Sequence, residues 1–226
     1  MGTAHVMAPA RVLRAAYEAA SAVVAGLGEE DSWLPTGCTG WAVRDLVHHC
    51  LTDAQRALVA LHTPARQPAD RDAVTYWRDW RPHTEGAADG RRWARVNGSM
   101  VLDFGRLQDL YLETLAAVTH AAGEADPAQR VRTQGHVLTA GDLLVTLAVE
   151  ATIHQLDLTV ELPHPPPPAP EGLAAVRATL DGLLGRPALP DWTDEHYARV
   201  GTGRNTLTAA ERAALGPAAD LFPLFG

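Results

Sequence analysis

The sequence predicts a mainly all-α protein whose first part is an up-down four-helix bundle. Four long stretches repeat apolar residues at spacings of three and four, which is the pattern of amphipathic helices. Hydrophobic residues make up 46% of the 226 residues and charged residues 20%, as is typical of a globular protein. A proline-rich segment then interrupts the helical pattern. We therefore expect a bundle at residues 1–162, a stiff linker at 163–170 and a small α+β extension at 171–226.

The bundle helices can be placed from the apolar repeat and from residues that favour helix ends. We expect them at residues 10–27, 39–62, 98–122 and 139–162. Gly28 fits a C-cap of the first helix, and the Thr139 side chain can cap the fourth. Just before the fourth helix, residues 131–137 predict a short extended piece.

The connection at residues 63–95 is long and lacks a helical repeat. It holds Trp77, Trp80 and Trp93 among several arginines. Connections of this length often form functional lids or binding loops. The tryptophans equally fit a simple cover over one end of the core, because each indole buries a large area.

The C-terminal part predicts short elements. Residues 171–184 repeat apolar positions as a helix does, whereas residues 189–207 predict a loop with short strands. Thr208 and Glu211 then have the spacing of a capping box, which indicates the start of another short helix.

Charge and composition indicate where the protein is expected to occur and which kinds of partner it is not expected to bind. The net charge is −8 and all 19 basic residues are arginine, a bias expected of a GC-rich bacterial genome. Such an acidic chain lacks the basic footprint of a nucleic-acid-binding protein. No apolar run is long enough for a membrane span and no export signal is visible, so we expect a cytoplasmic protein without nucleic-acid or membrane partners. In that reducing compartment Cys38 and Cys50 are expected to be free thiols.

The predicted fourth helix carries acids and an imidazole among its apolar residues. Glu150, His154 and Asp157 lie four and three residues apart, so they share one helix face. Burying a carboxylate beside an imidazole is costly unless both are paired, and a metal ion is a common solution. The same spacing also fits an internally hydrogen-bonded pair without a metal.

A third ligand is available on the second helix, where His49 lies on the apolar side. His49, Glu150 and His154 would bind one divalent ion and leave positions open, as catalytic zinc sites do. The ligand set suits Zn²⁺ and equally Fe²⁺ or Ni²⁺. Asp45 and Asp157 could accept hydrogen bonds from the imidazole N–H groups around this metal site, or pair with neighbouring arginines.

Two strings of the sequence resemble a known family. TGCTGWAVRDLVHH at residues 36–49 and the E-x-x-x-H-Q-L-D-L string of the fourth helix resemble the DinB-like bundle superfamily. Within it, the chain is most similar to the N-terminal domain of mycothiol-dependent maleylpyruvate isomerases, over residues 10–162. The resemblance implies the same three metal ligands: His49 ends the W-x-V-x-D-L-V-x-H motif, and Glu150 and His154 form E-x-x-x-H.

The resemblance also implies an activity. The expected protein is a zinc enzyme that uses mycothiol, a low-molecular-weight thiol, as a metal-activated nucleophile. It would be a cis-trans isomerase or a thiol S-transferase acting on a small molecule, with Arg204 and Arg95 as candidates for binding substrate or thiol. A metal-dependent hydrolase using metal-bound water and a non-catalytic metal-binding stress-response bundle are alternatives. We expect a monomer or a homodimer.

Overall fold

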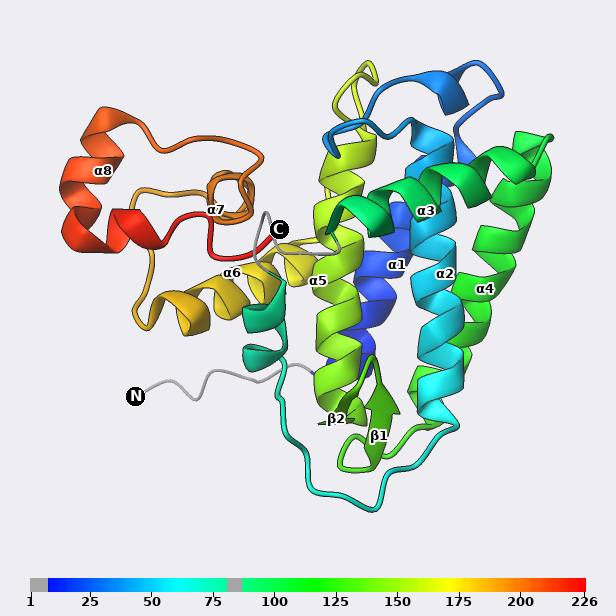
Figure 1. Cartoon of the computed structure of the whole chain (residues 1–226), viewed down its shortest axis with the longest axis horizontal. Coiled ribbons are helices and arrows are strands. Elements are labelled where there is room, and N and C mark those ends of the chain that lie inside the picture. Colours follow the sequence, from blue (N-terminus) through cyan, green and yellow to red (C-terminus); the bar gives the residue numbers. More distant parts are fainter. Residues whose placement is uncertain (1–7, 81–86) are drawn as a thin grey trace.

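The computed structural model describes the backbone of residues 8–80 and 87–226 and the side chains of 8–80 and 92–226. Four long helices form a bundle: α1 (Pro9–Ala25), α2 (Val43–Leu61), α4 (Phe104–Glu124) and α5 (Ala140–Leu158). Both α1 and α2 pack against α4 and α5, so α1 and α2 stand at opposite corners (Figure 1). The predicted, mainly helical bundle is confirmed. No helix in these ranges is long and apolar enough to cross a membrane.

Apolar side chains from all four helices meet in the bundle interior. Leu13 of α1, Val47 of α2 and Leu115 of α4 are among those almost completely buried there. Helix α5 is the most covered, since fifteen of its nineteen residues are buried. A helix that is apolar on every side needs neighbours all round. On the side away from the bundle, α6 (Pro170–Leu184) provides them (Figure 1).

The ends of the first two helices differ from the prediction by a few residues. Gly26, and not Gly28, is the C-cap of α1. Helix α2 begins at Val43 rather than at 39 or 40, because the Ala42 backbone is extended. The Asp45 carboxylate accepts a hydrogen bond from the Ala42 N–H at 3.0 Å and so holds this start in place.

The single helix predicted at 98–122 is wrong at its start. Its residues are divided between α3 (Ala87–Met100) and α4. Asp103 separates the two helices, because its backbone is extended and its carboxylate accepts a hydrogen bond from the Gly105 N–H at 2.9 Å. The predicted connection at 63–95 therefore contains the first part of α3 and a short 3-10 helix, η2 (Thr75–Asp79), while its residues 81–86 lie outside the described part of the chain.

A β-hairpin joins α4 to α5. Strands β1 (Arg130–Thr133) and β2 (His136–Thr139) pair antiparallel, which confirms the extended piece predicted at 131–137. Gln134 and Gly135 have positive φ angles of 46° and 83°, as a two-residue hairpin turn requires. The Thr139 hydroxyl accepts a hydrogen bond from the Asp142 N–H at 3.0 Å, so Thr139 caps α5 as predicted.

The described C-terminal part is helical, so the strands expected at 189–207 are wrong. After α6 it contains α7 (Asp194–Gly201), α8 (Ala209–Leu215) and a 3-10 helix, η3 (Gly216–Leu221). Thr193 starts α7, because its hydroxyl accepts a hydrogen bond from the His196 N–H at 3.2 Å. The capping box of Thr208 and Glu211 at the start of α8 is confirmed.

A second cluster of buried side chains joins the C-terminal tail, residues 171–226, to the segment at residues 63–80. Trp77 of η2 packs on Phe225 with ring centroids 4.4 Å apart, and Leu180 of α6 and Tyr197 of α7 belong to the same cluster. Trp77 therefore covers the core, in line with the simpler of the two interpretations of the tryptophan-rich connection. Trp93 on α3 does not, because 54% of it is exposed.

We expect Gly172→Ala to lower the free energy of unfolding by about 1–3 kcal/mol, because α6 lies directly against α5 there. A Cβ at Gly172 would overlap the Thr152 hydroxyl, which donates to Ala148 O at 2.7 Å and resists displacement. Chemical denaturation measures the change. In the control Gly123→Ala the new Cβ meets only Arg14, at 4.0 Å, so stability should stay equal or rise. Equal stability of the two variants would contradict the close α5–α6 contact.

Candidate metal centre

The three predicted metal ligands meet where α2 faces α5. Glu150 Oε1 lies 3.5 Å from His49 Nε2 and 3.4 Å from His154 Nε2. The two imidazole rings are 5.0 Å apart between centroids and nearly perpendicular, at 89°. One ligand atom from each residue lies within 4.8 Å of the other two. The structure thus brings together side chains from two helices that are far apart in the chain.

Asp157 supports the His154 ring from its other nitrogen. Asp157 Oδ2 accepts a hydrogen bond from His154 Nδ1 at 3.0 Å, which leaves Nε2 on the side of Glu150. Asp157 is completely buried, and Arg204 from the tail donates to both of its carboxylate oxygens, at 3.1 and 2.9 Å. Asp157 therefore lies behind the His154 ring, on the side away from Glu150, and it holds Arg204 as well.

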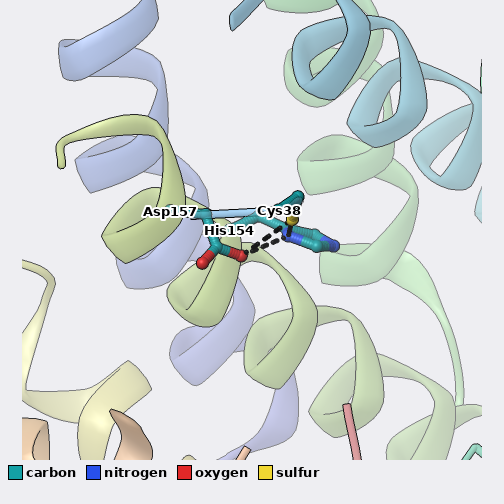
Figure 2. A group of neighbouring side chains, drawn as sticks. All are labelled: Cys38, His154 and Asp157. Carbon is teal, nitrogen blue, oxygen red and sulfur yellow. Dashed lines mark hydrogen bonds and ion pairs between the residues drawn. The ribbon is translucent and has the colours of Figure 1, made fainter. Parts of the chain in front are cut away.

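Cys38 joins this group from the connection between α1 and α2 (Figure 2). Its thiol donates to Asp157 Oδ2 at 3.2 Å, and its sulfur lies 3.8 Å from His154 Nδ1. Gly37 allows the approach: its N–H donates to Asp157 O at 3.0 Å, and a Cβ there would overlap the Asp157 carboxylate. Cys38 and Cys50 are both free, as predicted, but no sequence pattern indicated that Cys38 reaches α5.

Mutual pairing sets the ionisation of the partly buried Glu150 and the buried Asp157. Burial by itself would raise the pKa of Glu150, but the rings of His154 and His49 outweigh burial and hold that pKa well below its usual value. Burial also disfavours the charge on Asp157, yet His154 and Arg204 lower the pKa of Asp157 strongly. Both groups are therefore carboxylates at neutral pH, the form that binds a metal or supports a metal-binding histidine.

A further acid, Asp53, lies at this centre although it is absent from the set predicted from sequence. It follows His49 by one turn of α2, and its Oδ2 lies 3.3 Å from His49 Nε2. Burial raises the pKa of Asp53, so this carboxyl group holds a proton more readily than an exposed one. Its spacing of four from His49 is a signal that could have identified it, since residues four apart share a helix face.

The remaining predicted site residues lie in different places. Asp45 serves the start of α2 through its bond to the Ala42 N–H, and it lines a hollow beside α3. Arg95 lies on α3 and lines the same hollow. Trp41, which sequence reasoning missed, also lines the hollow, and its ring centroid is 5.1 Å from that of His49. The hollow and the histidine cluster are therefore neighbours.

The residues of this cluster fit a divalent metal ion. Two imidazole nitrogens and a carboxylate oxygen converge, and one imidazole has the outer carboxylate partner that metal-binding histidines usually have. The distances of 3.4 and 3.5 Å between the facing atoms are long for hydrogen bonds. Mutual hydrogen bonding thus satisfies these groups only weakly, whereas one cation would pair with all three.

The fold and the cluster define a class of helical-bundle proteins with an interior histidine–carboxylate site. The chain belongs to the family described as mycothiol maleylpyruvate isomerase N-terminal domain, whose model matches residues 13–159. This membership confirms the resemblance found in the sequence strings around His49 and His154.

Two solved structures are similar to this chain. One is a mycothiol-dependent maleylpyruvate isomerase, with a TM-score of 0.54 and 19% identity over 80% of this chain and 72% of that one. The other is a mutant of a mycothiol-dependent maleylpyruvate isomerase, with a TM-score of 0.61 and 17% identity over 91% of this chain and 93% of that one. At these identities the likeness shows a shared fold. A comparison with curated protein sequences found no match.

We expect Arg204→Ala to lower the free energy of unfolding by about 3–5 kcal/mol, because it leaves the Asp157 carboxylate buried without its cation. Replacing both, as Asp157→Asn with Arg204→Ala, should cost less than the two single changes added together. Denaturation curves of the wild type, the two single variants and the double variant give the coupling free energy between Asp157 and Arg204. Arg199→Ala is the control, since its pair with Glu195 is partly exposed and should contribute under about 1 kcal/mol. Strict additivity would contradict the buried pairing.

Proposed function

We propose that this protein is a metal- and thiol-dependent enzyme in which His49, Glu150 and His154 bind one divalent ion, in the first place Zn²⁺. The observation that carries the proposal is the convergence of their three ligand atoms beside Asp157, which fixes the orientation of the His154 ring. Membership of a family named for a mycothiol-dependent isomerase supports it. The same ligands would also suit Fe²⁺ or Ni²⁺.

A divalent ion at this position would lower the pKa of a coordinated thiol and so supply a thiolate near neutral pH. The two similar structures are mycothiol-dependent maleylpyruvate isomerases, and we propose mycothiol as the thiol for this chain too. A thiolate that adds to a conjugated cis double bond, and leaves after rotation about the resulting single bond, gives cis-trans isomerisation. A thiolate that displaces a leaving group gives an S-transferase.

The protein's own side chains hold the reacting groups in position. Asp157 keeps the Nδ1 of His154 engaged, so that Nε2 stays available on the side of Glu150. Each of the three guanidinium nitrogens of Arg204 donates to a protein oxygen, two contacts being with Asp157 and one with Thr202. We therefore assign Arg204 to positioning Asp157 and assign substrate binding to Arg95 on α3.

Metal-dependent hydrolysis, with water in place of the thiol as nucleophile, is the second candidate function. The specific observation in its favour is Asp53, an acid beyond the three ligands and 3.3 Å from His49 Nε2. Its raised pKa suits a group that takes up and returns a proton during the reaction. The thiol-dependent function ranks first because the family model is named for a mycothiol enzyme.

We expect purified wild-type protein to contain about one divalent ion per chain, and His49→Ala or His154→Ala to lose it. Each change removes one of three ligands, and elemental analysis by mass spectrometry measures the metal-to-protein ratio. His120→Ala is the matched control, because His120 is exposed on α4 and should leave the metal content unchanged. Full occupancy in both ligand variants would overturn the proposed metal site.

We expect mycothiol to produce a thiolate-to-cobalt charge-transfer band when added to protein in which Co²⁺ replaces the native ion. The band reports a sulfur ligand at an open coordination position, and absorbance spectroscopy measures it. Cysteine and glutathione serve as comparison thiols. Absence of the band with every thiol, in protein shown to hold cobalt, would reject the thiol-dependent function in favour of hydrolysis.

A further inference from the structure

A hollow of about 690 Å³ lies between α3, the start of α2 and the connection that precedes α2. This volume is within the range of roughly 300–1,000 Å³ that is usual for small-molecule sites. The lining of the hollow includes Trp33, Trp41, Asp45, Arg92, Arg95 and Ser99. Figure 1 shows α3 lying across α2 on this side of the bundle. We call this site the tryptophan–arginine hollow.

Two indole rings form the aromatic part of the hollow. Trp33, at the end of the 3-10 helix η1 (Asp31–Trp33), is 62% exposed, yet its ring is held by the buried Arg44, whose guanidinium carbon lies 4.1 Å from the ring centroid. Arg44 is itself fixed by a hydrogen bond to Val101 O at 2.8 Å. Trp41 is only 8% exposed and lies between the hollow and His49. A large, supported and exposed indole is suited to stacking on a planar ligand.

Two arginines form the charged part of the hollow. Arg92 and Arg95 are three residues apart on α3, so they project from the same side of that helix. Both are exposed, and neither has an acidic partner within 4 Å among the residues that the structure describes. On a chain with a net charge of −8, two guanidinium groups that lie beside a concave site and form no ion pair with any described acid favour an anionic ligand.

The position of Asp45 favours one orientation of an anionic ligand in the hollow. Its carboxylate lies at the start of α2, where it accepts the Ala42 N–H, and it would repel a negative group placed beside it. The α3 backbone comes close at this point, since a Cβ on Gly98 would lie 3.0 Å from Asp45 Oδ1. The negative end of a ligand is therefore favoured near Arg92 and Arg95, and an uncharged ring near the two indoles.

We propose that the tryptophan–arginine hollow binds an organic carboxylate that carries a planar ring, with the ring against Trp33 and Trp41 and the carboxylate on Arg92 and Arg95. Guanidinium groups bind carboxylates through paired hydrogen bonds, and the Ser99 hydroxyl offers another donor. Trp41 lines the hollow and its ring also lies close to that of His49, so the ring-bearing end of the substrate would lie next to the proposed metal ligands. As a statement about the substrate this inference rests on the proposed function, whereas the binding itself needs no metal.

Isothermal titration calorimetry of metal-free wild-type protein with 2-naphthoate tests the proposal. We expect one binding site per chain. The double variant Arg92→Ala, Arg95→Ala should bind at least about tenfold more weakly, because it loses both guanidinium groups while keeping a good helix former at each position. Arg106→Ala, at an exposed arginine on the neighbouring α4, is the matched control and should bind as the wild type does. Circular dichroism confirms that the variants are folded.

Two other ligands distinguish the contribution of the arginines to binding from that of the indole rings. The uncharged 2-naphthalenemethanol should bind at least about tenfold more weakly than naphthoate, since it lacks the carboxylate. Maleate, which has carboxylates and no ring, should also bind more weakly, and Trp33→Ala should remove most of the preference for the ring. No binding of naphthoate at millimolar concentration, unchanged binding in the double arginine variant, or equal binding of maleate would each overturn the proposal.

The His49→Ala protein distinguishes this proposal from the proposed function. Naphthoate should bind to it as to the wild type, because the hollow does not use His49 as a contact. If His49→Ala retains its metal while naphthoate still binds through the two arginines, the metal assignment fails and the hollow stands. If His49→Ala loses the metal and the double arginine variant binds naphthoate normally, the hollow fails and the metal assignment stands.

Discussion

The carboxylate of Asp157 is the group on which the rest of the structure depends. It lies on α5, the helix with neighbours on nearly every side, where an ionised group is costly unless donors surround it. His154, Cys38 and Arg204 provide those donors. They come from α5 itself, from the connection before α2 and from the tail, so one buried charge joins three parts of the chain.

This arrangement makes the C-terminal tail part of the site although the tail lies outside the bundle. Arg204 follows α7, and α7 is held in place by the cluster that contains Tyr197, Leu180 and Trp77. Close packing on α5 supports the same geometry, because Gly172 of α6 and Gly37 of the connection both lie too near α5 for a side chain. The orientation of the His154 ring is thus determined by packing that extends well beyond the bundle.

Trp41 separates two chemically different sides of the same end of the bundle. On one side are the partly buried histidines and acids, whose charges are matched to one another. On the other side Arg92 and Arg95 of α3 are exposed and form no ion pair with an acid among the described residues. Under the two proposals, the first side would bind a metal ion and the second an organic anion, so that a substrate in contact with both would be held at one end and react at the other.

The sequence by itself determined the four bundle helices, the Thr139 cap and the shared face of Glu150, His154 and Asp157, because these depend on residues within a few turns of one another. It did not reveal the break at Asp103, since the apolar spacing continues across it. Only the tertiary structure decided that Cys38 and Arg204 meet at Asp157 and that Trp41 lies beside His49. The contacts of Cys38 and Arg204 with Asp157 join segments far apart in the chain, and they are favourable because a buried carboxylate needs paired donors. The contact of Trp41 with His49 depends on how the connection before α2 packs against that helix.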